Sequence, residues 1–399
     1  MKKYALVLSG GGFKGAFQLG ALQYIRQNWK TITGETSEMH FDIIAGVSVG
    51  ALNGVMVGMN KFEALEQLWA EAKVNSDIIY TSEIVQVGGN GKPKIKPGLI
   101  GTLKNKLFPN WNWGTIGWNA LFAKQKLANE FEANFKKFRS IANFQPLYNK
   151  LETFSDVAAL MQNKTLFMCG FVNLDDGIYY KVTSDNLPGA DNAAKSKSLA
   201  KSIWASASLP IVWDPVKLDV MVNGQPFTCK NAVDGGIRNV SPLGDIIDLM
   251  TDTDDYTVFI INCNSGKVPF TTNNESIASI ALRSLDDIAI TEVFNGDISE
   301  FIRINKLVEQ ASQAGIQLKN EKGEPLVAFK YYLMNPDNEI IGDTLDSTQQ
   351  RIDARINHGR EVAARETTNP SSYKVHLQQM KQPSIDEDTD DTGPMRTKK

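Results

Sequence analysis

The sequence predicts an α/β protein, because apolar strands are followed by glycine-rich turns and by helical patterns. Residues 1–8 form an apolar run that glycines end. The segment that follows carries apolar residues at spacings of three or four, at Leu19, Leu22, Ile25 and Trp29. Residues 41–59 repeat this order, since an apolar, β-branched run gives way to small residues that favour the start of a helix.

The rest of the chain adds further strands and helices. Tight Asp-Gly and Asn-Gly turns predict two β-hairpins, one over 165–182 and one over 217–233. Apolar periodicity predicts a core strand over 256–262 and a late strand over 326–333. We expect helices over 119–140, 198–209, 277–307 and 344–365.

Composition is that of an ordinary globular protein. The chain has 399 residues and a formal net charge of −3, and 42% of its residues are hydrophobic. This length suffices for one large α/β domain or for two domains with buried cores. A net charge so close to zero gives no overall attraction to nucleic acid or anionic lipid, so any such contact has to come from a local patch.

Cysteine usage and the N-terminus bear on where the protein works. The three cysteines are odd in number and widely spaced, at Cys169, Cys229 and Cys263. This pattern indicates buried, reduced thiols, and no Cys-x-x-Cys pair or His/Cys cluster predicts zinc. Two N-terminal lysines precede an apolar run that glycine ends too early for a signal peptide. We therefore expect a cytoplasmic protein with neither a signal peptide nor a transmembrane helix.

Ser48 lies between Gly46 and Gly50, where the predicted strand within residues 41–59 meets its helix. Residues 46–50 read Gly-Val-Ser-Val-Gly and match G-x-S-x-G in the strand–turn–helix setting of a nucleophile elbow. In such an elbow the serine occupies a strained turn. Small neighbours let the following helix pack closely and let a substrate carbonyl reach Oγ.

Two other interpretations of residues 41–59 are open at this point. Glycines recur at every fourth position, as in the packing face of a transmembrane helix. Asp42, Asn53 and Asn60 count against a membrane span, as do glycines that weaken a helix. Alternatively, the serine is incidental and the glycines serve only close backbone packing. The choice depends on whether Ser48 has catalytic partners elsewhere in the chain.

A glycine run at residues 9–15 separates the first strand from the first helix and reads Ser-Gly-Gly-Gly-Phe-Lys-Gly. Such a run lets consecutive backbone N–H groups point to one place at a helix N-terminus, which forms a nest for an anion. The run lacks the G-x-x-x-x-G-K-[ST] of a P-loop, and its spacing only approaches that of a dinucleotide loop. The nest suits either a phosphate or an oxyanion, unless the glycines serve a tight turn alone.

Asp234 is the candidate general base for Ser48. It follows the second predicted hairpin and precedes Gly235 and Gly236, which leave its carboxylate uncrowded. For Asp-Gly-Gly by itself, a plain turn is the alternative interpretation.

The three histidines are poorer candidates for the base. His40 lies at the far end of the strand that leads to Ser48. His358 lies in a helical segment that we expect on the surface, and His376 lies in or beside a polar tail. A two-residue Ser/Asp site is therefore favoured over a Ser-His-Asp triad.

The three motifs together resemble those of the patatin-like phospholipases, in the same order. The residues that carry the resemblance are Gly10-Gly11-Gly12-Phe13-Lys14-Gly15, Gly46-Val47-Ser48-Val49-Gly50 and Asp234-Gly235-Gly236. A similar segment precedes the aspartate, at residues 205–210 and 214–216. The matching part covers residues 3–242, and beyond about Ser265 nothing matches.

The resemblance implies a three-layer α/β/α sandwich with a mainly parallel central sheet. It also implies that a Ser48/Asp234 dyad hydrolyses acyl esters of membrane glycerolipids or lysolipids, with no cofactor and no metal. The resemblance further implies an oxyanion hole formed by the backbone amides of Gly10, Gly11, Gly12 and Phe13. The residues that support the motifs are Lys14, Gly15, Gly46, Gly50, Gly235 and Gly236.

Residues 84–129 form a basic insertion without a single acidic residue. Its lysines lie on both sides of a tryptophan-bearing central part, which suits peripheral contact with an anionic membrane. The residues that we expect to make this contact are Lys92, Lys94, Lys96, Trp111 and Trp113. RNA binding by the same residues and a solvated insertion that packs back onto the domain are the alternatives, and no nucleic acid partner is expected overall.

These observations predict one acyl hydrolase domain over 1–366, followed by a disordered, charged tail over 367–399. The predicted activity is that of a serine esterase of the phospholipase A or lysophospholipase type, which works through an acyl-enzyme on Ser48. The alternative is a lipid-binding or effector module that has this fold but little or no turnover.

Overall fold

The computed structural model describes residues 2–82, 85–87, 93–95, 140, 142–250, 254–268, 280, 283–320 and 323–380. The strands are β1 (Lys2–Leu8), β2 (Ile43–Gly46), β3 (Val85–Val87), β4 (Pro93–Ile95), β5 (Leu166–Asn173), β6 (Tyr179–Thr183), β7 (Val216–Val222), β8 (Gln225–Asp234), β9 (Asp255–Ile261) and β10 (Lys330–Met334). The α-helices are α1 (Gly15–Thr33), α2 (Val49–Gly58), α3 (Phe62–Ala72), α7 (Gln145–Phe154), α8 (Val157–Gln162), α9 (Asn192–Ser206), α10 (Leu243–Leu249), α12 (Ile290–Gln313), α13 (Asn338–Ile341), α14 (Gln349–Thr368) and α15 (Tyr373–Gln379).

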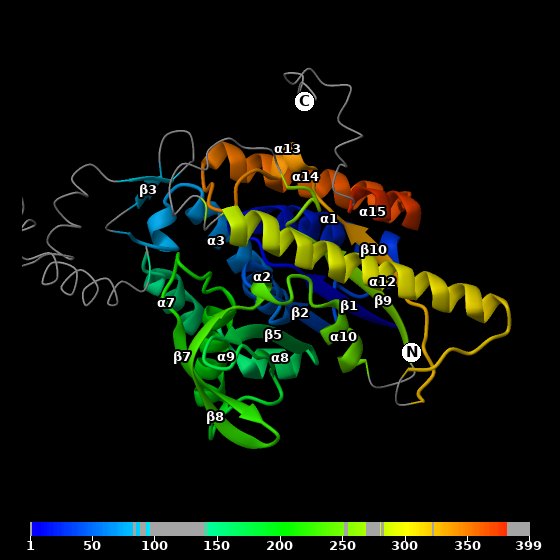
Figure 1. The fold of residues 1–399 in the computed structure, drawn as a ribbon, viewed down its shortest axis with the longest axis horizontal. Helices are drawn as coiled ribbons and strands as arrows, with labels where there is room; N and C mark the ends of the chain where they lie inside the picture. Colours follow the sequence, from blue (N-terminus) through cyan, green and yellow to red (C-terminus); the bar gives the residue numbers. More distant parts are fainter. Residues whose placement is uncertain are drawn as a thin grey trace, which may run out of the picture.

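One sheet organises the molecule (Figure 1). Its strands follow the order β10-β9-β1-β2-β5-β8-β7, and β6 also pairs with β5. The pairs from β10 to β5 are parallel, whereas β6, β7 and β8 add antiparallel pairs. Strands β3 and β4 form a separate antiparallel pair. Both predicted hairpins are present, as β5–β6 and β7–β8.

Helices cover both faces of the sheet and complete three layers. Side chains alternate between the faces along a strand, so Leu6 and Leu8 of β1 join a core with α1, α2 and α9. Ala5 and Val7 of the same strand join the opposite core, with α10 and α12. Both faces of β1 are therefore apolar and buried, as is typical of a parallel sheet. The predicted three-layer α/β/α architecture with a mainly parallel sheet is confirmed.

The carboxyl ends of β1 and β2 lie side by side, because Leu8 pairs with Gly46. The glycine run after β1 and the serine turn after β2 thus begin at the same edge of the sheet. On β5, Cys169 pairs with Gly46, and Phe171, two residues further on, pairs with Asp234 of β8. The register brings all three predicted motifs to one edge.

The C-terminal part packs on the N-terminal motif region rather than forming a separate unit. Helix α14 lies along α1 (Figure 1), where Gly20 of α1 and Gly359 of α14 let the two backbones meet. A Cβ at Gly20 would lie 2.7 Å from the carbonyl carbon of Ile356. The prediction of a surface helix was wrong, since Arg355 and His358 of α14 are buried. One face of α14 is buried because glycines allow close backbone contact with α1. The apolar periodicity of the sequence did not predict this burial.

The chain stays helical beyond residue 367. Helix α14 ends at Thr368, and α15 follows with His376 and Met380 buried. Tyr373 and Leu377 pack against the core that α12 covers, which fixes this segment. The predicted disordered tail was therefore wrong for this first part, and residues 381–399 lie outside the described residues.

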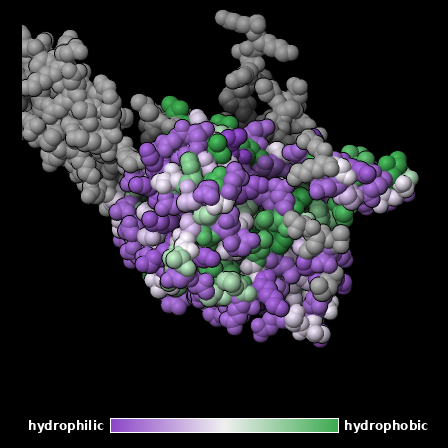
Figure 2. Space-filling view, turned by 90° about the horizontal axis from the view of Figure 1, so that it is seen from below, coloured by the Kyte–Doolittle hydropathy of each residue, from purple (hydrophilic) through white to green (hydrophobic). Residues whose placement is uncertain are grey.

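Among the described residues, no helix is long and apolar enough to cross a membrane. The face in Figure 2 is mostly hydrophilic, with apolar residues in smaller groups between the polar ones. All of the predicted helix over 119–140 except residue 140, and most of the basic insertion, lie outside the described residues. This includes Lys92, Lys96, Trp111 and Trp113, and of Lys94 only the backbone, in β4, is described.

Candidate active site

Ser48 sits on a strained turn between β2 and α2. Its φ of 56° and ψ of −125° are a conformation that non-glycine residues rarely adopt. Gly50 makes this turn possible, because a Cβ there would collide with the backbone carbonyl of Leu8. Ser48 is 7% exposed and stands at the N-terminus of α2, where the helix dipole favours negative charge. This is the geometry of a nucleophile elbow.

The glycine run lies against this turn. A Cβ at Gly10 would come 3.3 Å from the Cβ of Ser48, so the absence of a side chain lets the two loops touch. Gly11 and Gly12 have φ angles of 155° and 54°, which glycine adopts readily. The run then enters a short 3-10 turn, Gly12–Lys14, that leads into α1.

The four amides predicted for the oxyanion hole divide into two pairs. The N–H of Gly10 donates to the carbonyl of Val240 at 3.1 Å, and that of Phe13 donates to the carbonyl of Thr344 at 3.0 Å. Among the described residues, the amides of Gly11 and Gly12 have no hydrogen-bond acceptor. Carbonyls from distant segments thus occupy the N–H groups of Gly10 and Phe13, and the amides of Gly11 and Gly12 are the better-placed candidates for the oxyanion hole.

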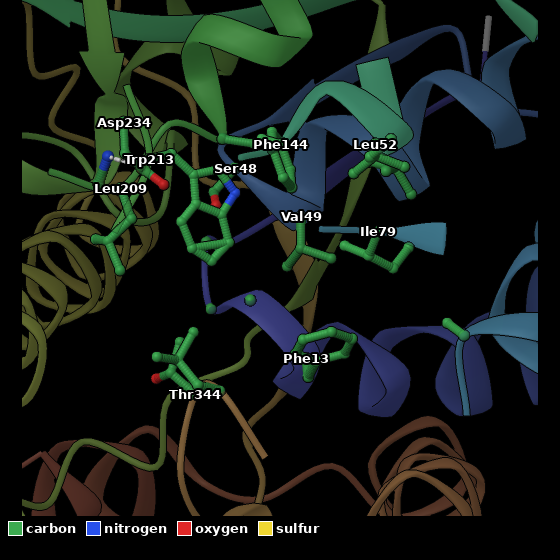
Figure 3. Close-up of a pocket in the computed structure, with 18 of the residues that line it drawn as sticks. Phe13, Ser48, Val49, Leu52, Ile79, Phe144, Leu209, Trp213, Asp234 and Thr344 are labelled. Atoms are coloured by element: carbon green, nitrogen blue, oxygen red, sulfur yellow. Dashed lines mark hydrogen bonds between the residues drawn. The ribbon is translucent and has the colours of Figure 1, made fainter. Parts of the chain in front are cut away.

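Asp234 ends β8 and is 5% exposed. Its Oδ1 accepts a hydrogen bond from the N–H of Gly236 at 2.7 Å, shown as the dashed line in Figure 3. A Cβ at Gly236 would lie 3.0 Å from this Oδ1, and a Cβ at Gly235 would collide with the carbonyl of Gly170. The two glycines thus let the turn fold back under the carboxylate and fix its direction.

The end of α9 and the residues just after it form hydrogen bonds with the backbones of both residues of the predicted dyad. Ser206 Oγ accepts a hydrogen bond from the N–H of Ser48 at 3.0 Å. The carbonyl of Ser208 accepts one from the N–H of Asp234 at 2.9 Å. Ser206 and Ser208 are both fully buried. Only the family resemblance singled out this segment in the sequence. Two small residues at the end of a predicted helix could also have indicated a contact of this kind.

Ser48 and Asp234 line the same pocket, which measures about 920 Å³ when its open mouth is included (Figure 3). Gly11 and Gly12 line it as well. Its wall is otherwise apolar and comes from α2, α3, α7, the chain between α3 and α7, and the segment after α9. The residues are Val49, Leu52, Leu68, Trp69, Ile79, Phe144, Leu147, Leu209 and Trp213. Thr344 and Leu345 add a wall from the C-terminal part.

A buried polar network supports the wall of this pocket. Gln18 donates to the carbonyls of Ser9 and Ile261, and its Oε1 accepts a hydrogen bond from Asn53. Asn53 Oδ1 in turn accepts the indole N–H of Trp69 at 3.0 Å. The network joins α1, α2 and α3 beneath the glycine run. In the sequence, Asn53 counted only against a membrane span, and its place in this network was not predicted.

The supporting residues of the motifs have structural roles. A Cβ at Gly15 would collide with Val49, and one at Gly46 would collide with the backbone of Gly50. Both glycines therefore permit close packing around the elbow. Lys14 does not line the pocket, and its backbone N–H donates to the carbonyl of Gly11 at 3.0 Å.

None of the chain's three histidines, all within the described residues, lines the pocket. His358 Nε2 accepts the N–H of Asp337 at 2.9 Å, and its ring packs against Phe17. His40 lies before β2, 3.9 Å from the carboxylate of Asp42.

The cysteines are buried and free, as predicted. Burial raises the pKa of each thiol to about 12, so none of them is a nucleophile at neutral pH. The described residues contain no cluster of His, Cys, Asp and Glu suited to a metal ion.

Comparison with known proteins identifies the family. The family model of the patatin-like phospholipases matches residues 6–247. The chain belongs to this family. Membership makes it, in general terms, a lipid acyl hydrolase whose substrates are lipids. Residues 248–380, including Thr344 and α14, lie beyond the matched part.

Two solved structures are similar in part. VipD from Legionella pneumophila has 11% identity and a TM-score of 0.37, over 97% of this chain and 72% of VipD. A chain of the heterodimeric ExoU–SpcU complex, from the type III secretion system of Pseudomonas aeruginosa, has 14% identity and a TM-score of 0.25. That match covers 90% of this chain and 52% of the other. No curated protein matches the sequence.

Asp297 of α12 contacts the segment that holds the glycine run in place. Its carboxylate accepts the N–H of Ser241 at 3.4 Å, next to Val240, whose carbonyl holds Gly10. Burial is the main cause that raises the pKa of Asp297 to about 7; the backbone N–H groups of Ser241 and Val240 lower it, and the neighbouring carboxylates of Asp245 and Glu300 add to the rise.

This raised pKa predicts a pH-dependent stability. Between the unfolded value of about 4 and the folded value of about 7, the folded protein binds more protons, so its free energy of unfolding falls as the pH rises. Asp297→Asn removes this contribution, and we expect it to lose less stability than wild type between pH 5 and pH 8. Urea unfolding at both pH values measures the difference, with Glu292→Gln, which changes an exposed carboxylate at the start of the same helix, as control. Equal losses in wild type and Asp297→Asn would contradict the assignment.

Proposed function

We propose that this patatin-like protein hydrolyses carboxylic esters of glycerolipids or lysolipids, with Ser48 as nucleophile and Asp234 as general base. The observation that carries the proposal is that Ser48, on a strained turn, and Asp234 line one apolar pocket together with the amides of Gly11 and Gly12. Nucleophile, base and oxyanion donors are the three parts that acyl transfer requires.

In the first half of the reaction, Ser48 Oγ attacks the ester carbonyl and Asp234 accepts the hydroxyl proton. The carbonyl oxygen becomes an oxyanion, which the N–H groups of Gly11 and Gly12 stabilise. One such donor typically contributes about 2.7–4 kcal/mol in the transition state. Collapse of the intermediate breaks the ester bond, and Asp234 returns the proton to the departing alcohol.

In the second half, water attacks the acyl-enzyme. Asp234 takes a proton from this water, and the same two amides hold the second oxyanion. The C–O bond to Ser48 breaks, the serine recovers a proton and a fatty acid leaves. Ser206 and Ser208 contribute by fixing the backbones of Ser48 and Asp234.

The pocket wall favours an acyl chain as the bound part of the substrate. Val49 and Leu52 continue from Ser48 along α2, and the wall beyond them consists of Leu68, Trp69 and Leu147. Burial of each methylene group in such a pocket contributes about 0.8 kcal/mol. This supports a phospholipase A or lysophospholipase type of reaction.

The alternative, a lipid-surface module with little turnover, depends on the basic insertion, which lies mostly outside the described residues. Peripheral membrane contact through that insertion is likewise a proposal. Tight binding to anionic vesicles without any release of fatty acid would favour this alternative over the hydrolase.

A fluorescent fluorophosphonate tests the nucleophile directly. We expect it to label the folded protein once, through a bond between phosphorus and Ser48 Oγ with loss of fluoride, because only an activated serine reacts quickly. Mass spectrometry of the labelled peptide identifies the residue, and heat-denatured protein serves as the control. A label on any other serine would refute the assignment of Ser48.

A further inference from the structure

The two free amides of the glycine run lie between two amides that are fixed. On one side, Gly10 is held by the carbonyl of Val240, within the part that the family model matches. On the other side, Phe13 is held by the carbonyl of Thr344, which lies beyond that part. A Cβ at Gly12 would come 2.9 Å from the same carbonyl oxygen, so Thr344 touches the run directly. The direction of the Gly11 and Gly12 N–H groups thus depends on a C-terminal loop.

Arg355 of α14 holds this loop in place. Its Nε donates to the carbonyl of Ile341 at 2.8 Å, its Nη1 to that of Asp346 at 2.6 Å and its Nη2 to that of Asp343 at 2.6 Å. The guanidinium is fully buried. A planar guanidinium presents its donors in a fixed fork, so three carbonyls bound at once define the path of residues 341–346 around Thr344.

Helix α14 is itself fixed relative to the glycine run. It packs on α1, the helix that the run opens, through backbone contacts at Gly20 and Gly359. Asp343 adds a local restraint, because its Oδ1 accepts the N–H of Leu345 at 2.8 Å and closes the turn that carries Thr344. A continuous set of contacts therefore leads from α14 to the amide of Phe13.

We propose that Arg355 is a positioning residue for the oxyanion-binding amides of Gly11 and Gly12, acting through the loop 341–346 and the carbonyl of Thr344. The expected effect on kinetics rests on the proposed function. The structural part of the proposal, that Arg355 fixes residues 10–13, does not depend on that function. The active site of this chain is then completed by a segment outside the family's matched part.

The expected effect is on the chemical step rather than on substrate binding. Arg355 does not line the pocket, and its hydrogen-bond partners do not include the apolar residues of α2, α3 and α7 that line it. A displacement of about 1 Å in a catalytic group costs on the order of a hundredfold in rate. We therefore expect Arg355→Met to lower kcat for p-nitrophenyl butyrate about tenfold to a hundredfold, with KM changed less than about threefold.

Two further variants complete the test. Arg360→Met is the matched control, because Arg360 lies on the same helix but bonds to Gln23 on the exposed surface. Asp343→Ala is a milder change at an exposed position that opens the turn around Thr344 and leaves the buried guanidinium intact. Thermal unfolding establishes that each variant is folded before it is assayed.

Three measurements decide the proposal: kcat and KM, the rate of fluorophosphonate labelling, and hydrogen exchange in a peptide that covers residues 10–17. We expect Arg355→Met and Asp343→Ala to slow labelling and kcat and to speed amide exchange in this peptide about tenfold. Arg360→Met is expected to resemble wild type in all three. If Arg355→Met does not fold, Asp343→Ala carries the test.

Amide exchange at wild-type rates in folded Arg355→Met, or in Asp343→Ala if the former does not fold, would overturn the proposal. An equal loss of kcat in Arg360→Met would overturn it as well, since the effect would then belong to α14 in general. Absence of labelling and turnover in wild type would instead refute the proposed function. In that case faster exchange in the variants would still support the fixing of residues 10–13 by Arg355.

Discussion

Ser48→Ala is expected to reduce the release of fatty acid from phospholipid vesicles by at least about 10³-fold, because the variant lacks the hydroxyl that forms the acyl-enzyme in the proposed reaction. Asp234→Asn is expected to cause a loss of similar size. Asparagine keeps the shape of the side chain and can still accept the N–H of Gly236 through its oxygen, but it cannot take the proton of the serine. Titration of the released acid, with a short-chain p-nitrophenyl ester as second substrate, measures both losses.

Two nearby substitutions of the same kinds control for effects on folding. Ser202→Ala removes a buried hydroxyl on α9 that bonds only to the carbonyl of Ser198 among the described residues. Asp219→Asn changes a carboxylate on β7 that bonds to Thr228 at the surface. Both are expected to keep wild-type activity. Full activity in folded Ser48→Ala or Asp234→Asn would show that the dyad is wrong.

Gly20→Ala is expected to lower the free energy of unfolding by about 3 kcal/mol, the upper end of the usual cost of overpacking. The new methyl group would overlap the backbone of Ile356 on α14, and a backbone carbonyl cannot move aside as the end of a flexible side chain can. The two helices would have to separate. Urea denaturation at fixed pH measures the change in the midpoint and in the free energy of unfolding.

Gly296→Ala is the matched control for this change. Gly296 also lies inside a helix, α12, but a Cβ there meets nothing within 4 Å. Alanine favours a helix interior over glycine by up to about 1 kcal/mol, so this variant is expected to be as stable as wild type or more stable. If Gly20→Ala were as stable as Gly296→Ala, α14 would not be seated on α1 as described.

Much of the fold could be predicted because its signals are local. The strand before Ser48, the turn at residues 46–50 and the helix after it follow one another within a short segment, so periodicity and glycine spacing were sufficient. The two hairpins were predicted for the same reason, from Asp-Gly and Asn-Gly turns. Parallel register then carried Ser48 and the glycine run to one edge without further information.

The helix that carries Arg355 could not be predicted to be buried. Residues 349–368 are rich in charged side chains, and the pattern indicated a surface helix. The helix is buried because glycines on α1 and α14 let the two backbones come close together. In addition, the guanidinium of Arg355 donates hydrogen bonds to three carbonyls of a loop whose sequence shows no apolar periodicity. Neither cause leaves an apolar periodicity in the sequence.

The sequence by itself determined the family, the serine on its strained turn, the aspartate at the end of a strand and the glycines whose N–H groups suit an oxyanion. Only the tertiary structure decided which of those N–H groups are available. Gly10 and Phe13 donate to carbonyls from segments far away in the chain, whereas Gly11 and Gly12 meet no such acceptor within the part of the chain that the structure describes. The physical reason is that a backbone amide looks the same at every position of a sequence, and only the folded chain determines which acceptor it meets.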